Sequence, residues 1–341
     1  MRQAIRRFLP LLTVLAIVYA AMIALSAVDL PDRAARATGR SWGWKMPTFL
    51  LTRSAEGGIE FHTYNQRKIL EQAAINVILG VGMTYVILTG GIDLSVGSVV
   101  ALANVLFVGT LLRHGAGAGG VMLAVLTGVG AAAICGLING LLVAFARIQA
   151  FIATLGMMMI AKGLAFYLGG SEPVYLTCPN PLPAVLPIVI SSAVFVAGAG
   201  VLYWTVIGRH VYAVGGNAEA SRIAGVRVGR VRLFCYVVAG LCAGLASIVL
   251  WSRVGTGSYL HGEWYELYAI AAVVIGGTSF FGGEGSVVGT LIGALIIAIL
   301  NNGLDAAGID TTLQKIVVGA VIVVAACWDS WRRRHHRREA A

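Results

Sequence analysis

Charged residues are scarce in this sequence, and their scarcity excludes whole classes of protein. Asp, Glu, Lys and Arg make up only 12% of the chain, whereas hydrophobic types make up 58%. A soluble domain has about 25% charged residues, because a folded surface in water needs polar groups to cover it. The composition therefore excludes a soluble enzyme, and it equally excludes a disordered chain, which would be poor in apolar residues.

Cysteine is also scarce, and its spacing excludes a disulfide framework. The chain has 5 Cys without a C-x-x-C pair, and four of them lie in apolar segments where Cys acts as a small hydrophobe. The sequence lacks a G-x-x-x-x-G-K-[ST] phosphate-binding loop and the G-x-S-x-G and H-E-x-x-H hydrolase motifs. We therefore expect no metal, no cofactor and no catalytic residues in this chain.

Long, continuous apolar segments fill the sequence instead. A membrane-spanning helix needs about 20 such residues, whereas the strands of an outer-membrane barrel would show short alternating patterns. The sequence predicts an all-α, polytopic transmembrane bundle of about ten spans, near residues 8–28, 70–90, 96–112, 121–145, 150–169, 184–206, 233–251, 267–282, 286–304 and 313–329.

The net charge of +10 is clustered at both chain ends and in one loop. Arginine is concentrated in residues 1–7, 207–232 and 332–338. Such clusters mark the cytoplasmic side of a membrane protein, and ten spans place all three there. Nucleic-acid binding is not expected, since no aromatic platform accompanies the charge. The first apolar segment also resembles a signal peptide, but the many later spans favour a first transmembrane helix.

The charge pattern divides the chain into four parts. The basic N-terminus with the first span covers 1–28, and an insert at 29–68 is expected outside the cytoplasm. Trp42, Trp44 and Phe49 indicate that this insert rests at the membrane interface. The transmembrane core covers 69–330, and a basic cytoplasmic tail covers 331–341.

Two junctions between apolar segments resemble each other. Each has a Gly pair, Gly90–Gly91 or Gly276–Gly277, then a short polar turn, and then Gly-Ser-Val-Val at the start of the next segment. Paired Gly-interrupted segments indicate a transport pathway, because broken helices lie where they line a cavity. Two tight turns at the cytoplasmic surface would give the same pattern, and the residues alone leave both interpretations open.

Polar residues inside the apolar segments are the candidates for a substrate pathway. Asp93 is either a gate residue or a helix cap that accepts a backbone N–H from Ser95 or Val96. Lys162 either extends to the surface or faces the pathway, and Glu266 either caps a helix or faces a vestibule. Amides in spans commonly join helices, but they can also bind a polyol. The candidates are Asn76, Thr89, Asp93, Ser95, Asn139, Thr154, Lys162, Glu266, Thr278, Asn301 and Asn302.

Four ordered blocks resemble the ribose/xylose/galactose-type permeases of bacterial ABC importers. They lie at residues 82–98, 151–156, 212–226 and 265–279. The resemblance implies a permease subunit of the inner membrane that moves a monosaccharide by alternating access. It also implies a separate tandem ATPase subunit that binds ATP and Mg, a periplasmic sugar-binding protein, and a second permease copy or a close relative.

By the same resemblance, residues 215–226 are the coupling helix that enters a groove on the ATPase. Asn217 can cap a helix that begins at Ala218, with Glu219 near its positive end and Gly225 just after it. An ordinary positive connector is the alternative. The coupling residues expected are Arg209, Gly215, Gly216, Asn217, Glu219, Arg222 and Gly225.

The sequence departs from the family pattern at three positions and leaves the sugar open. Tyr268 stands where relatives usually have Asp, Lys162 where many have Arg, and Glu284 where an apolar or basic residue is usual. A polyol or a signalling furanose is an alternative cargo. An ion-coupled secondary transporter is a rival that needs buried acidic ion sites, and a membrane-embedded enzyme needs a catalytic set that the sequence lacks.

Overall fold

The structure is a computed structural model that describes residues 2–29, 43–44, 49–53, 59–61, 63–175, 182, 185–310, 312–321 and 323–324. Helices dominate the described residues, and three two-stranded antiparallel sheets pair β1 with β2, β3 with β4, and β5 with β6. The strands are β1 (Val28–Asp29), β2 (Gly43–Trp44), β3 (Leu51–Arg53), β4 (Ile59–Phe61), β5 (Val174–Tyr175) and β6 (Thr256–Gly257). The helices are α1 (Arg2–Ser26), α3 (Thr63–Leu88), α4 (Val96–His114), α5 (Ala118–Ala144), α6 (Ala150–Gly169), α7 (Leu186–Trp204), α8 (Val206–Gly216), α9 (Ala218–Ile223), α10 (Val228–Val254), α11 (Tyr265–Ile275) and α12 (Val287–Ala306).

The all-α polytopic prediction is confirmed. Within the described residues, eight helices are long and apolar enough to cross a membrane: α3, α4, α5, α6, α7, α10, α12 and the Phe8–Ser26 part of α1. A shorter apolar helix, Thr312–Val321, lies where the tenth span was expected. The basic tail at 331–341 and much of the insert at 29–68 lie outside the described residues, as do Trp42, Cys178 and Cys327.

The eighth predicted span, 267–282, is wrong as a full crossing. Helix α11 has only 11 residues and ends at Ile275. The chain then takes a left-handed turn at Gly277 (φ 83°), and the N–H of Thr278 bonds the carbonyl of Val273 at 3.1 Å. Glycine adopts positive φ at little cost, so the Gly pair stops a helix that hydropathy alone would continue.

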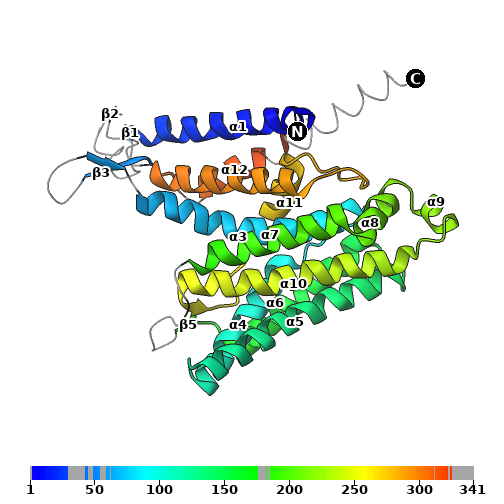
Figure 1. Cartoon of the computed structure of the whole chain (residues 1–341). Coiled ribbons are helices and arrows are strands. Elements are labelled where there is room, and N and C mark those ends of the chain that lie inside the picture. Colours follow the sequence, from blue (N-terminus) through cyan, green and yellow to red (C-terminus); the bar gives the residue numbers. More distant parts are fainter. Residues whose placement is uncertain are drawn as a thin grey trace.

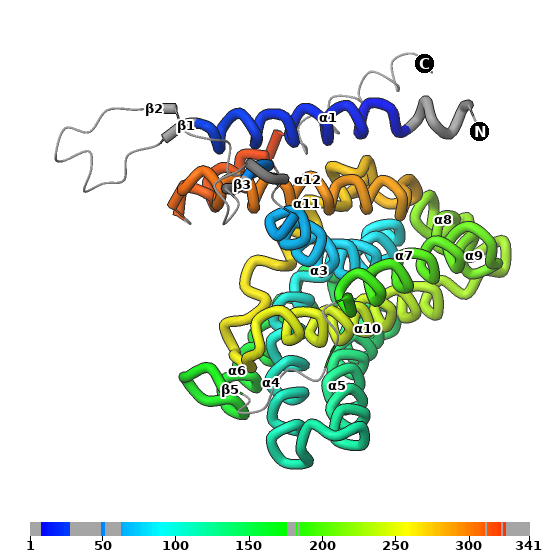
Figure 2. The backbone as a smooth tube through the Cα atoms, turned by 60° about the vertical axis from the view of Figure 1, so that its left-hand side comes forward, coloured from blue at the N-terminus to red at the C-terminus, as the bar shows by residue number. Residues whose placement is uncertain are grey.

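The helices form one bundle whose two ends differ (Figures 1 and 2). In both views α8 and α9 lie at one end, while β5 lies toward the opposite end. Helices α3 and α12 are 83% buried over their most apolar windows and form the centre. Helices α5, α6 and α7 are at most 28% buried, so they present broad apolar faces outward.

Glycine lets the two longest helices pack at close range. Both α5 and α10 carry a G-x-x-x-G pattern, at Gly136 and Gly140 and at Gly240 and Gly244. A Cβ added at Gly136 would lie 3.0 Å from the Cα of Gly240, so the two backbones meet. Small residues of this kind allow van der Waals contact and drive helix association in lipid. This crossing fixes α5, which carries Asn139, against α10, which carries Tyr236.

Candidate functional site

The first site is a buried polar cluster at the end of α3 nearest α9. Asp93 lies between α3 and α4 and is 2% exposed. Its Oδ1 accepts the Ser95 N–H at 2.9 Å and the Ser95 hydroxyl at 2.6 Å, and Asn139 on α5 donates to Ser95 Oγ at 2.9 Å. Asp93 thus accepts the backbone N–H of Ser95 as expected, but Ser95 and not Asp93 is the N-cap residue of α4, and Asp93 is buried in the bundle and not at its surface.

Two more side chains hold the segment that carries Asp93. Thr154 on α6 donates to the carbonyl of Ala150 at 2.9 Å and lies 3.4 Å from the carbonyl of Ile92. The hydroxyl of Tyr236 reaches the same carbonyl of Ile92 at 3.4 Å. Three helices therefore anchor one non-helical segment, which gives its backbone groups partners that lipid would not supply.

The two Gly-pair junctions end their helices in the same way. Gly90 has a positive φ (76°), and the N–H of Gly91 after it bonds the carbonyl of Val86 at 3.1 Å. Gly277 likewise has a positive φ, and the N–H of Thr278 after it bonds the carbonyl of Val273. Thr278 Oγ1 accepts the N–H of Ser286 at 3.4 Å and is fully buried. Gly90 and Gly277 are exposed, while Asp93 and Thr278 that follow them are buried. Each junction is thus a surface turn that leads into a buried segment. The turn agrees with the interpretation as a tight surface turn, and a role in a transport pathway stays a prediction.

The predicted coupling loop forms a short, capped helix. Asn217 Oδ1 accepts the N–H of Ala220 at 2.9 Å, and the side chains of Arg222 and Glu219 pair at 2.6 Å, both about 65% exposed. Gly225 takes a φ of 86° just after α9. The local cap prediction is therefore confirmed. Arg209 lies exposed on α8, the helix that leads into α9.

Main-chain contacts join this loop to the two Gly-pair junctions. A Cβ added at Gly215 would overlap the carbonyl oxygen of Leu88 and the nitrogen of Gly283. The N–H of Gly283 in turn bonds the carbonyl of Leu88 at 3.0 Å. A Cβ at neighbouring Gly216 would meet nothing within 4 Å. The end of α8, the end of α3 and the turn after α11 therefore meet backbone to backbone at Gly215.

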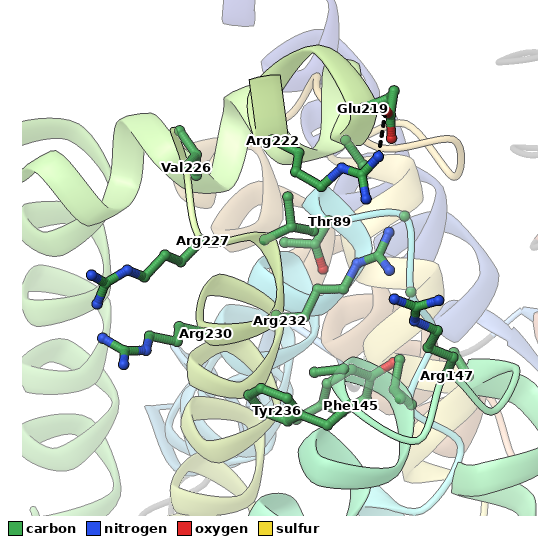
Figure 3. Close-up of a pocket in the computed structure, with 18 of the residues that line it drawn as sticks. Thr89, Phe145, Arg147, Glu219, Arg222, Val226, Arg227, Arg230, Arg232 and Tyr236 are labelled. Carbon is green, nitrogen blue, oxygen red and sulfur yellow. Dashed lines mark hydrogen bonds and ion pairs between the residues drawn. The ribbon is translucent and has the colours of Figure 1, made fainter. Parts of the chain in front are cut away.

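A basic cavity of about 910 Å³ opens beside α9. Figure 3 shows Arg147 and Arg232 extending into its space from different elements, with Thr89 and Tyr236 on the wall. Thr89 is buried and donates to the carbonyl of Val86 at 2.9 Å. Arg147 holds a positive φ of 56°, which is uncommon for a residue other than glycine. The cavity links the outer face of α9 to the segment that leads to Asp93.

The other pathway candidates are divided among different places. Lys162 and Glu266 line a separate cavity of about 240 Å³. Asn302 lines a polar cavity at the opposite end of the bundle together with Arg253 and Asp305. The Asn76 amide nitrogen and Asn302 Oδ1 are buried without a hydrogen-bond partner, and Asn301 is buried on α12. The candidates therefore form no single path within the described residues.

Sequence reasoning missed two residues near α9. Ile223 ends the helix with 81% of its surface exposed, which is unusual for an isoleucine on a polar helix. The sequence feature that could have identified Ile223 is a large apolar residue within a charged segment. Arg232 belongs to the predicted basic loop but was not singled out, because only the packing of α10 turns it into the cavity.

Comparisons with known proteins place the chain in a family. Residues 66–326 match the model of the branched-chain amino acid transport system / permease component. The ribose import permease protein of Escherichia coli (strain K12) is 41% identical over 285 residues, 79% of this chain and 87% of the relative. The ribose import permease protein of Bacillus subtilis (strain 168) is 41% identical over 281 residues, 78% of this chain and 84% of the relative.

The fructose import permease protein of Rhizobium meliloti is 38% identical over 294 residues, 82% of this chain and 81% of the relative. No solved structure matches the chain. The family model covers the described bundle from α3 to the helix Thr312–Val321, and the curated relatives extend over most of the same length. The chain belongs to the branched-chain amino acid transport system / permease component family and is, within it, similar to the ribose and fructose import permeases of bacteria.

Proposed function

We propose that this chain is the permease subunit of an ATP-driven importer for a monosaccharide, placed in the bacterial cytoplasmic membrane. The relatives at 41% and 38% identity are named for the import of ribose and fructose. The chain itself has no phosphate-binding loop. The energy therefore comes from a separate ATPase subunit, which binds ATP and Mg, and the sugar from a binding protein outside.

The contact at Gly215 is the observation that carries the mechanism. Helix α9 presents Ile223 and the Arg222–Glu219 pair outward, where an ATPase groove would receive them. Gly215 transmits any movement of α8 and α9 directly to Leu88 and Gly283. Leu88 ends α3 shortly before Asp93, so the movement reaches the broken segment. ATP binding would thereby reorient the pathway between two permease copies and pass the sugar without covalent change.

The test is co-expression of this chain with an ATPase subunit and a sugar-binding protein. We expect the ATPase to co-purify in fixed stoichiometry, and ATP hydrolysis to rise when binding protein loaded with ribose is added. Uptake that follows an ion gradient without ATP would overturn the proposal in favour of a secondary transporter. Stimulation by a loaded polyol or a furanose signal, and not by a monosaccharide, would reassign the cargo.

Gly215→Ala and Gly216→Ala form a matched pair for the coupling step. Both add one methyl group to the last turn of α8, but only Gly215→Ala displaces the backbone of Leu88. We expect Gly215→Ala to abolish stimulated hydrolysis and uptake while the ATPase still co-purifies, and Gly216→Ala to behave as the parent. Melting temperatures in detergent check that both variants fold. Equal uptake by the two variants would remove Gly215 from the coupling route.

A further inference from the structure

A second cavity is lined by residues other than those of α9. It has a volume of about 240 Å³ and is bounded by the start of α4, the middle of α6 and the segment that leads into α11. Its wall carries Lys162, Glu266, His261, Trp264 and Tyr259. An apolar bundle rarely holds so many polar groups together, because ionisable side chains in a membrane protein are costly and mark functional sites.

Two side chains of opposite charge, Glu266 and Lys162, line this cavity without forming an ion pair with each other. Glu266 stands in the first turn of α11, and Lys162 is half-buried on α6. The ammonium of Lys162 attracts the carboxylate of Glu266. The described residues nevertheless show no ion pair between them, since the pairs present are those of Glu71 and of Glu219. A ligand hydroxyl can donate to a carboxylate and accept from an ammonium, so both groups are suited to bind one.

Close backbone packing builds the floor of this cavity. A Cβ added at Gly97, in the first turn of α4, would overlap Glu266 Oε2 and the carbonyl oxygen of Gly262. The carboxylate therefore lies directly on α4, just beyond the segment that Asp93 and Ser95 hold. A shift of that segment, which the proposed coupling route would produce, moves the surface on which Glu266 rests.

The aromatic part of the wall is held in position. Trp264 takes a left-handed φ of 69° immediately before α11, and its side chain is 41% exposed. Strained backbone of this kind persists where the surroundings impose it, often at ligand sites. Tyr259 packs edge-on against Phe166 at 5.0 Å between ring centroids. His261 Nδ1 lies 3.0 Å from Asn104 Oδ1, which also accepts the N–H of Ser258.

These groups suit a neutral, polyhydroxylated ligand. A sugar presents hydroxyls along its edge and a C–H face, so it can bond Glu266 and Lys162 while it lies against the Trp264 ring. An anionic ligand would be repelled by the Glu266 carboxylate. An apolar ligand would leave the charges of Glu266 and Lys162 unpaired. The lining holds two acids, Glu263 and Glu266, and one base, Lys162, so it repels an anion and offers hydrogen bonds to the hydroxyls of an uncharged sugar.

We infer that the sugar binds in this cavity during transport. We also infer that Glu266, Lys162 and Trp264 determine which monosaccharide the permease transports. The inference rests on the proposed function. It joins two pathway candidates from the sequence, Lys162 and Glu266, with an aromatic residue that the sequence did not single out.

The experiment measures transport and ATP hydrolysis in proteoliposomes that hold the complete complex, with ribose and fructose as probes. The variants are Glu266→Gln, which removes the charge, and Trp264→Leu, which removes the ring. Glu172→Gln and Trp204→Leu are matched controls, because both residues are exposed and lie outside the cavity. Melting temperatures in detergent confirm that the variants fold.

We expect the cavity variants to lower sugar transport per ATP hydrolysed by about tenfold, the change given by about 1.4 kcal/mol, and to alter the ratio of ribose to fructose transport. Stimulation of hydrolysis by the loaded binding protein should stay within about twofold of the controls, since α9 is unchanged. Transport and sugar ratio equal to those of the controls would overturn the inference. Absence of ATP-driven transport in the unaltered chain would instead overturn the proposed function.

Discussion

At the scale of single residues, Asp93 determines whether the broken segment holds together. Its Oδ1 is the side-chain acceptor for both the N–H and the hydroxyl of Ser95 among the described residues. Asp93→Ala leaves both buried donors unpaired, which costs about 1–3 kcal/mol. We therefore expect a melting temperature in detergent that is several degrees lower, by the usual relation between free energy and melting temperature.

Asp93→Asn is the matched control, because its amide oxygen can still accept from Ser95. We expect it to melt near the unaltered protein. A normal melting temperature for Asp93→Ala would show that Ser95 finds another acceptor and that the segment is held elsewhere. Loss of uptake in Asp93→Asn at an unchanged melting temperature would show that the charge, and not the cap, matters for transport.

At the scale of elements, the α5–α10 crossing depends on glycine and not on side-chain chemistry. Gly136→Val would push valine into the backbone of Gly240, and overpacking of this kind costs about 1–3 kcal/mol. We expect a lower melting temperature and weaker ribose uptake, because Asn139 on the same helix would lose its position against Ser95.

Gly130→Val lies on the same helix at a position where an added Cβ meets nothing within 4 Å. This control should melt close to the unaltered protein. If Gly136→Val and Gly130→Val melt together, the helices are free to separate slightly and the close crossing is not required for folding.

At the scale of the whole molecule, the packing predicts which ends share a side of the membrane. Helix α4 begins beside Asp93, near the α9 end, and runs away from it to His114, which is exposed. Ala224 is exposed just after α9. In a Cys178→Ser, Cys327→Ser background, with Cys135, Cys235 and Cys242 buried, an impermeant maleimide should label His114→Cys from outside intact cells. Ala224→Cys should react only in inside-out vesicles. Labelling of both from the same side would contradict this topology.

The sequence predicted those features that depend on local composition. Residues 150–169 were expected as a span and form α6 with the same bounds, and Asn217 caps α9 as its residue type indicates. The length of α11 was missed, because hydropathy counts apolar residues and gives no weight to the turn at Gly277. The sequence left open whether Glu266 caps a helix or faces a vestibule, and the cavity around it could not be derived for a different reason. It depends on the approach of Gly97 to Gly262, two residues far apart in the chain, which no periodic pattern encodes.

The contact of Gly215 with Leu88 and Gly283 has a consequence for how such transporters diverge. Main-chain atoms are the same in every protein, so this linkage does not depend on side-chain identity once the glycine is present. In the proposed complex, the exposed residues of α9, which include Ile223 and Arg222, can differ between transporters and so fit different ATPase subunits. We therefore expect that partner choice can be transplanted by exchanging the surface of α9 alone, while the inward connection is inherited unaltered.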